Sequence, residues 1–230
     1  MSKKRKSSHY VAEKKARERT EKKIAEKKQK RNKLILTVLI WAACILAVIG
    51  TIIGVTFALG FWDYYPEATH HAAIEIEDYG TVHLELYGND APETVENFIK
   101  LAEEGYYDEL PFRTIIDGFK VQGGEGMGTP SIKGEFSANG FRNRVRHERG
   151  VISMVRSDDS ADSAADEFFI LLKDYPRYNG SYAAFGKVTS GIEILEKMCA
   201  DTEPYDDEGS IAPHAQPRIK SISIHGAHEH

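Results

Sequence analysis

The stretch from Leu34 to Trp62 contains no charged side chain and consists mostly of Leu, Ile, Val and Ala. Its roughly 29 positions exceed the about 20 that an α-helix needs to cross the hydrocarbon core of a bilayer. A buried helix of a globular protein is rarely apolar on every face over such a length. The sequence therefore predicts one transmembrane helix over residues 34–62. An aromatic belt is expected at its far end, formed by Phe61, Trp62, Tyr64 and Tyr65.

A cleaved signal peptide is the competing interpretation of this run. Ala58, Leu59 and Gly60 place small residues at the spacing that a signal peptidase reads. The apolar region of a signal peptide has about 7 to 15 residues, however, and this run is about twice as long. We therefore expect an anchor that is not cleaved.

The segment before the apolar run is strongly basic. Residues 1–33 contain 15 Lys and Arg against 4 Asp and Glu, so residues 34–230 carry a net charge of −16 within the total of −5. Basic residues next to a span remain on the cytoplasmic side and attract anionic lipid. We expect a basic cytoplasmic tail over 1–33, and an acidic domain on the outer side of a single-pass cell-membrane protein. Nucleic-acid binding is the rival role for the tail, but Tyr10 is the only Phe, Tyr or Trp among its basic residues, and we expect no nucleic-acid partner.

Cysteine and histidine predict neither a disulfide nor a metal site. Cys44 lies in the apolar run and Cys199 in a helical pattern far away, so the two have no reason to meet. Several of the nine histidines lie in the linker and at the carboxyl end, where solvation is the default. His147 and Ser153 are close in sequence, but this alone does not predict a catalytic set.

Residues 72–230, after a short linker over 63–71, have the length of a single domain. Alternating apolar residues predict a hairpin over 73–76 and 81–86. Apolar residues at helical spacing predict a helix between Pro92 and Gly105 and a second helix around 192–198. Further β-rich runs are expected at 113–121, 150–155, 168–172, 183–188 and 219–224. Many short strands with two helices indicate a mainly β fold, a closed barrel with helices over its ends.

Four blocks of this domain resemble the cyclophilin-type peptidyl-prolyl cis-trans isomerases, in their bacterial version. The first block is Gly105-Tyr106-Tyr107-Asp108 followed by FRTIIDGFKVQGG at residues 112–124. The others lie at residues 134–156, 163–170 and 178–188, and the resemblance extends in order over residues 73–225. It implies a closed eight-stranded antiparallel barrel capped by two α-helices, a groove for proline-containing polypeptides, and no cofactor or metal.

The resemblance also implies a set of site residues. The expected catalytic positions are Phe119, Gln122, Lys120 and Thr114. The expected substrate-binding positions are Phe169, Glu167, Val155, Arg156, Met154, Tyr178, Tyr182 and Arg113.

Four of these positions depart from the family pattern. Thr114 occupies the place of the catalytic arginine, and Arg113 stands one residue earlier, where only a local bulge would bring it to the same face of the strand. Lys120 replaces an apolar residue, and Glu167 replaces a glutamine whose amide donates to the substrate; a carboxylate only accepts. We expect Lys120 either to pair with Glu167 or to supply the missing cation.

The sequence thus predicts a prolyl isomerase that acts on X-Pro bonds of exported proteins at the membrane surface and assists their folding. The alternative is a catalytically weak proline-peptide-binding chaperone or scaffold module, because Thr114 stands where the arginine is expected.

Overall fold

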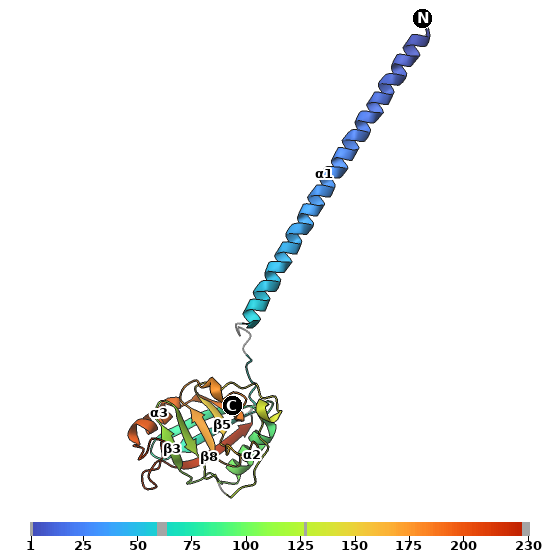
Figure 1. Cartoon of the computed structure of the whole chain (residues 1–230). Coiled ribbons are helices and arrows are strands. Elements are labelled where there is room, and N and C mark those ends of the chain that lie inside the picture. Colours follow the sequence, from blue (N-terminus) through green and yellow to red (C-terminus); the bar gives the residue numbers. More distant parts are fainter. Residues whose placement is uncertain (1, 59–63, 127, 227–230) are drawn as a thin grey trace. The chain divides into compact units, whose positions relative to one another are not determined.

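The computed structural model describes residues 2–58, 64–126 and 128–226, with side chains of the first helix described at Lys22 and from Glu26 to Val55. The chain divides into two units, Met1–Asp63 and Tyr64–His230. The first unit contains α1, Ser2–Ala58 (Figure 1). Its segment Glu26–Val55 includes a window of mean hydropathy 2.7, so this one helix is long and apolar enough to cross a membrane. The predicted end of the span, 59–62, with Phe61 and Trp62 of the expected belt, lies outside the described residues.

The second unit is built on one antiparallel sheet of eight strands, in the order β3-β4-β6-β5-β7-β2-β1-β8. The strands are β1 His70–Ile76, β2 Gly80–Leu86, β3 Phe112–Ile116, β4 Lys120–Gly123, β5 Val151–Met154, β6 Phe168–Leu171, β7 Ala184–Ser190 and β8 Ile219–Gly226. The predicted helices are confirmed as α2, Pro92–Glu103, and α3, Ile192–Asp201, which lie on opposite sides of the domain (Figure 1). The run predicted at 113–121 is a hairpin instead of one strand, because the chain turns at residues 117–119.

The prediction of a closed barrel is wrong, because β3 and β8 are the free edges of an open, curled sheet. Within the described part of the chain the two edges meet only at an isolated bridge between Pro111 and Arg218. The segment before β8 runs along β3 and takes its hydrogen bonds: the Ile115 amide donates to Gly209 O at 2.8 Å, and the Ile211 amide to Arg113 O at 2.9 Å. With these groups occupied, β3 cannot form a ladder with β8.

The core between the sheet and α2 is aromatic. Phe98 of α2 is fully buried, and its ring lies 5.2 Å from that of Phe185 and 5.8 Å from that of Phe168. Such ring pairs stabilise by about 0.5 to 1.5 kcal/mol beyond the burial of their area. This core packs against the inner face of the sheet and so holds the strands that carry the outer face.

The amino end of α2 is held by a distant carboxylate. Glu135 is 2% exposed and accepts hydrogen bonds from the amides of Glu93 and Thr94 at 3.1 and 2.8 Å. We expect Glu135→Gln to lower the free energy of unfolding by about 2 kcal/mol, because a charge-assisted pair at the positive end of a helix is lost. Urea unfolding of the domain measures this. Glu96→Gln on the exposed face of α2 is the control; an equal effect of both changes would contradict the role of Glu135.

Candidate active site

Three predicted site residues and one neighbour, Ser153, form one row across four strands. Thr114 of β3 lies opposite Gln122 of β4, Gln122 opposite Phe169 of β6, and Phe169 opposite Ser153 of β5. Because side chains of directly paired residues share a face of the sheet, this row lies on one face. The next row, which includes Ile115 and Val121, faces the core and is fully buried.

A β-bulge brings Arg113 next to this row. The register of β3 against β4 shifts between Phe112 and Thr114, so Arg113 is the extra residue. Arg113 and Thr114 are both partly exposed, while Phe112 is fully buried. The guanidinium of Arg113 is bound to Glu125: it forms an ion pair with the Glu125 carboxylate at 3.1 Å and donates a hydrogen bond to the Glu125 carbonyl at 3.2 Å.

The expected direct ion pair between Lys120 and Glu167 does not occur among the described side chains. Gln122 stands between them instead. Its Oε1 accepts a hydrogen bond from Lys120 Nζ at 3.1 Å, and its Nε2 donates to Glu167 Oε1 at 2.7 Å. The amide that would anchor a substrate is therefore engaged at both ends by charged neighbours.

Burial shifts the pKa values of Lys120 and Glu167, the two charged groups that Gln122 connects. Desolvation raises the pKa of Glu167, against the hydrogen bond from Gln122 and the nearby cations Arg113 and Lys120. Desolvation lowers the pKa of Lys120, and the Glu167 carboxylate opposes that shift. Two neighbouring charged groups whose pKa values are both shifted by burial are typical of a functional site.

Aromatic side chains cluster around Phe169, where the sequence predicts the floor of a groove. Phe169 is 2% exposed, and the rings of Tyr178 and Tyr182 each lie 5.5 Å from it. Phe119, in the turn before β4, packs on Tyr175 at 4.9 Å. Lys120 Nζ lies 5.5 Å from the centre of the Phe169 ring, which places a cation directly beside this apolar floor.

A buried polar group lies beneath Phe169, in a supporting role that the sequence did not predict for His147 and Ser153. His147 is 1% exposed, stacks on the Phe169 ring at 6.3 Å, and is linked through Nε2 to Ser153 Oγ at 3.0 Å. Its Nδ1 meets Asn179 Oδ1 at 3.1 Å. Because both His147 and Ser153 are buried, the group positions Phe169 and is not open to a substrate.

This histidine makes the stability of the domain depend on pH. Burial lowers the pKa of His147 to about 4, against the hydrogen bond with Asn179. The unfolded chain binds the proton near the ordinary pKa of about 6.5, so the free energy of unfolding should fall by about 3 kcal/mol as the pH drops from about 6.5 to about 4. Urea unfolding at several pH values measures the fall. An NMR titration in which the His147 imidazole protonates near pH 6.5 in the folded domain would contradict this account.

The remaining predicted residues divide between groove and core. Val155 and Arg156 line a second cavity of about 290 Å³ beside the groove, together with Glu167 and Gly126. Arg156 Nε donates to the Ser181 carbonyl at 2.8 Å, and its guanidinium lies 5.0 Å from the Tyr182 ring. Met154 is fully buried in the core, so its side chain cannot bind a substrate, contrary to the prediction.

Asp166, next to Glu167, is a second residue that the sequence did not single out. It is fully buried and accepts hydrogen bonds from the amides of Glu125 and Gly126 at 2.9 and 3.0 Å. Gly124 has φ +100°, and a Cβ there would lie 2.9 Å from the Asp166 carbonyl oxygen. Asp166 therefore fixes the glycine-rich loop that carries Glu125, the partner of Arg113.

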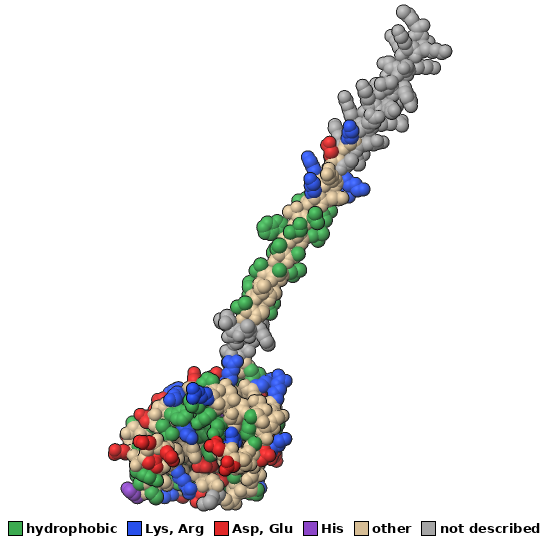
Figure 2. All heavy atoms as spheres, in the orientation of Figure 1, with side chains coloured by type: hydrophobic (Ala, Val, Ile, Leu, Met, Phe, Trp, Pro, Cys, Tyr) green, Lys and Arg blue, Asp and Glu red, His purple; other side chains and the backbone are tan. Residues whose placement is uncertain are grey.

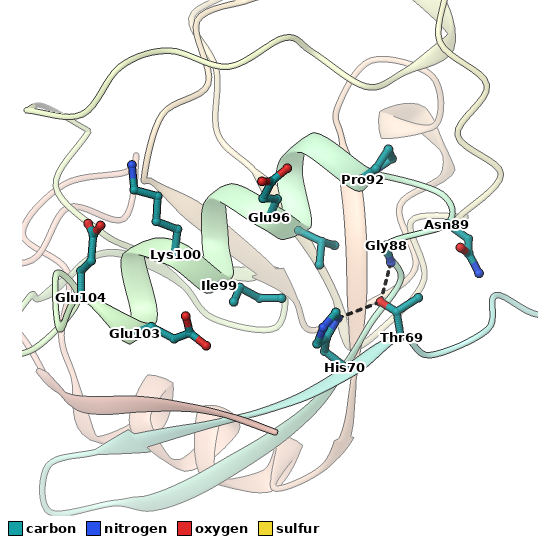
Figure 3. Close-up of a pocket in the computed structure, with 11 residues that line it drawn as sticks. Thr69, His70, Gly88, Asn89, Pro92, Glu96, Ile99, Lys100, Glu103 and Glu104 are labelled. Atoms are coloured by element: carbon teal, nitrogen blue, oxygen red, sulfur yellow. Dashed lines mark hydrogen bonds between the residues drawn. The ribbon is translucent and has the colours of Figure 1, made fainter. Parts of the chain in front are cut away.

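A cavity lies elsewhere in the domain, between α2 and the start of β1 (Figure 3). Its volume is about 600 Å³, and none of the predicted site residues lines it. Ile99 of α2 and His70 of β1 point into it from its two sides, and Thr69 Oγ1 accepts a hydrogen bond from the Gly88 amide at 3.0 Å at one end (Figure 3).

Comparison with known proteins identifies the family. Residues 71–224 match the family described as cyclophilin type peptidyl-prolyl cis-trans isomerase/CLD. Peptidyl-prolyl cis-trans isomerase B of Bacillus subtilis is 41% identical over 127 residues, which are 54% of this chain and 86% of that protein. A peptidyl-prolyl cis-trans isomerase of Helicobacter pylori is 38% identical over 123 residues, 52% of this chain and 74% of that protein. The chain belongs to the cyclophilin-type peptidyl-prolyl cis-trans isomerases.

A solved structure supports the same assignment. It is a cyclophilin-type isomerase of Cryptosporidium parvum, crystallised in the presence of the dipeptide Ala-Pro, with a TM-score of 0.58 and 28% identity. The match covers 67% of this chain and 98% of that one. The domain of this chain therefore has the extent of a complete cyclophilin.

Proposed function

We propose that the domain catalyses the cis-trans isomerisation of X-Pro bonds in exported polypeptides at the outer surface of the cell membrane, with Lys120 as the cation of the site. The observation that carries this proposal is the position of Lys120 Nζ, 5.5 Å from the ring centre of the groove floor residue Phe169. The family assignment supports the reaction.

The reaction needs positioning and electrostatics but no nucleophile. The X-Pro bond rotates slowly because its C–N bond has partial double-bond character, with a barrier of about 18 to 20 kcal/mol. In the twisted state that conjugation is lost and the proline nitrogen becomes pyramidal, so a nearby cation or donor stabilises it. Phe169 and Phe119 would hold the proline ring, and the Lys120 ammonium would face its nitrogen.

The location follows from the first unit of the chain. α1 contains a segment apolar enough to cross a bilayer, and the exposed large side chains along it include Trp41, which is 67% exposed. The 15 cations of residues 1–33 favour a cytoplasmic amino end that rests on anionic lipid, and this supports an outer position of the isomerase domain. Protease digestion of intact cells that leaves the domain uncut would contradict this orientation.

A proline-binding module with weak catalysis is the second candidate. It is favoured by the hydrogen bond from Gln122 Nε2 to Glu167 Oε1 at 2.7 Å, which occupies the amide that would anchor a substrate. In that case the groove would bind and release proline-containing segments without accelerating the cis-trans isomerisation of their X-Pro bonds.

The pH dependence of the rate tests the proposed site. As the pH falls through the raised pKa of Glu167, the carboxyl group gains a proton and becomes a donor; as the pH rises through the lowered pKa of Lys120, the cation is lost. We expect kcat/KM to fall at each of these steps as the pH rises. Isomerisation of an X-Pro peptide followed by NMR measures it. Glu167→Gln should remove the acid step alone; an unchanged profile in this variant would contradict the assignment.

A further inference from the structure

An arginine row crosses one edge of an otherwise acidic domain. Residues 34–230 contain 15 Lys and Arg against 31 Asp and Glu, yet four of those cations fall within residues 142–149. Arg142, Arg144 and Arg146, which we call the arginine row, alternate with residues that point inward. A local concentration of one charge sign on a surface of the opposite sign indicates a binding surface for the complementary charge.

The segment that carries the row is fixed to the domain. Asn143 Nδ2 donates to the carbonyls of Glu135 and Ala184 at 3.1 and 2.8 Å. Val145 and His147, the next alternate residues, are 8% and 1% exposed. Because every second side chain is held inside, the three arginines lie together on the exposed side of the segment.

The row is tied to the first residue of the domain. Tyr64 Oη donates to the buried Asp90 carboxylate at 2.7 Å and accepts from Arg144 Nη2 at 2.6 Å. The Arg144 guanidinium also lies 3.6 Å from the Tyr64 ring centre and pairs with Asp90 at 3.3 Å. Tyr64 thus holds the entering chain against the middle of the row.

The length of the connection limits how far the row can be from α1. That helix ends at Ala58, six residues before Tyr64. Six residues span at most about 22 Å even when fully extended. If α1 crosses the membrane, as proposed above, the arginine row remains within a few tens of ångströms of the lipid surface, whatever the path of the connection.

We propose that the arginine row binds the anionic headgroups of the membrane in which the protein is anchored. A guanidinium matches a phosphate with two parallel hydrogen bonds, and each cation near an anionic bilayer contributes about 1 kcal/mol. On the face drawn in Figure 2, Lys and Arg side chains gather at the end where the chain enters the domain, and Asp and Glu are frequent over the rest. The anionic surface would attract the row and repel the remainder, which sets one orientation of the domain. This inference rests on the proposed membrane anchor.

Vesicle flotation with the domain over residues 64–230 tests the row without the anchor. The domain has the extent of a complete cyclophilin, so it can be studied alone. We expect about tenfold stronger binding to vesicles with one-third phosphatidylglycerol than to pure phosphatidylcholine vesicles, and a loss of binding in high salt. The variant Arg142→Glu/Arg146→Glu keeps the contact between Arg144 and Tyr64 and should abolish the difference. Lys100→Glu/Lys197→Glu, the same charge change on α2 and α3, should preserve it.

Two results would overturn the inference: equal binding to both kinds of vesicle, or binding to soluble polyphosphate without any preference for anionic vesicles. Hydrogen exchange of the full chain in nanodiscs gives the second measurement. Residues 141–147 should exchange more slowly in anionic than in neutral discs, and the double glutamate variant should exchange equally in both. Extraction of the full chain from membranes by alkali would refute the anchor and leave the vesicle result standing, so the two proposals fail separately.

Discussion

Replacement of Thr114 by arginine is expected to raise kcat/KM for a short X-Pro peptide by about 100- to 1000-fold. Thr114 is partly exposed on the face of the groove and lies directly opposite Gln122. A guanidinium at this point adds rigid, charged donors beside the proline site, where a transition-state interaction contributes about 2.7 to 4 kcal/mol. NMR exchange between the cis and trans peptide measures the rate in the domain over residues 64–230.

The matched control is Thr189→Arg, an exposed threonine of β7 outside the groove, which should leave the rate unchanged. If Thr114→Arg had no effect while the domain remained folded, the absence of arginine at this position would not limit the enzyme. The rate of the native domain would then depend on other groups of the site, and Lys120→Met would decide whether Lys120 is one of them.

Lys120→Met is expected to lower kcat by about 100-fold and to leave KM nearly unchanged. In the proposed mechanism the ammonium near Phe169 stabilises the twisted state more than the bound substrate, whereas methionine keeps the bulk of the side chain and makes the surface apolar. The same NMR exchange experiment at several peptide concentrations separates kcat from KM. Lys187→Met, which removes an exposed lysine paired with Glu148, is the control. An unchanged or increased rate in Lys120→Met would refute the role of Lys120.

Local sequence patterns were sufficient to predict the helices and strands, but they did not predict that the sheet stays open. The helix between Pro92 and Gly105 and the hairpin of β1 and β2 follow from apolar periodicity and turn residues, and both are present. The open edge could not be read in this way, because it depends on residues 209–211, which pair with β3 from about one hundred residues further along the chain. Apolar periodicity within a segment carries no information about which distant segment will pair with it.

The motif positions were sufficient to predict which residues belong to the candidate site. They did not predict the hydrogen bonds and strand pairing that connect these residues. The blocks placed Phe119, Gln122 and Phe169 in one groove, but the bulge at Arg113 arises from the pairing of β3 with β4. The insertion of Gln122 between Lys120 and Glu167 depends on side-chain reach across two strands. No role was predicted for His147 or Asp166, because a buried polar residue and an exposed one look the same in a sequence.

The most direct test of the account is the isomerisation rate of one X-Pro peptide with the unmodified domain, measured beside Thr114→Arg and Thr114→Arg/Glu167→Gln. We expect the unmodified domain to accelerate the reaction well above the uncatalysed rate, and both variants to be faster still. A rate equal to background in the unmodified domain, with activity only in the variants, would contradict this expectation and identify the native protein as a binder of proline-containing chains.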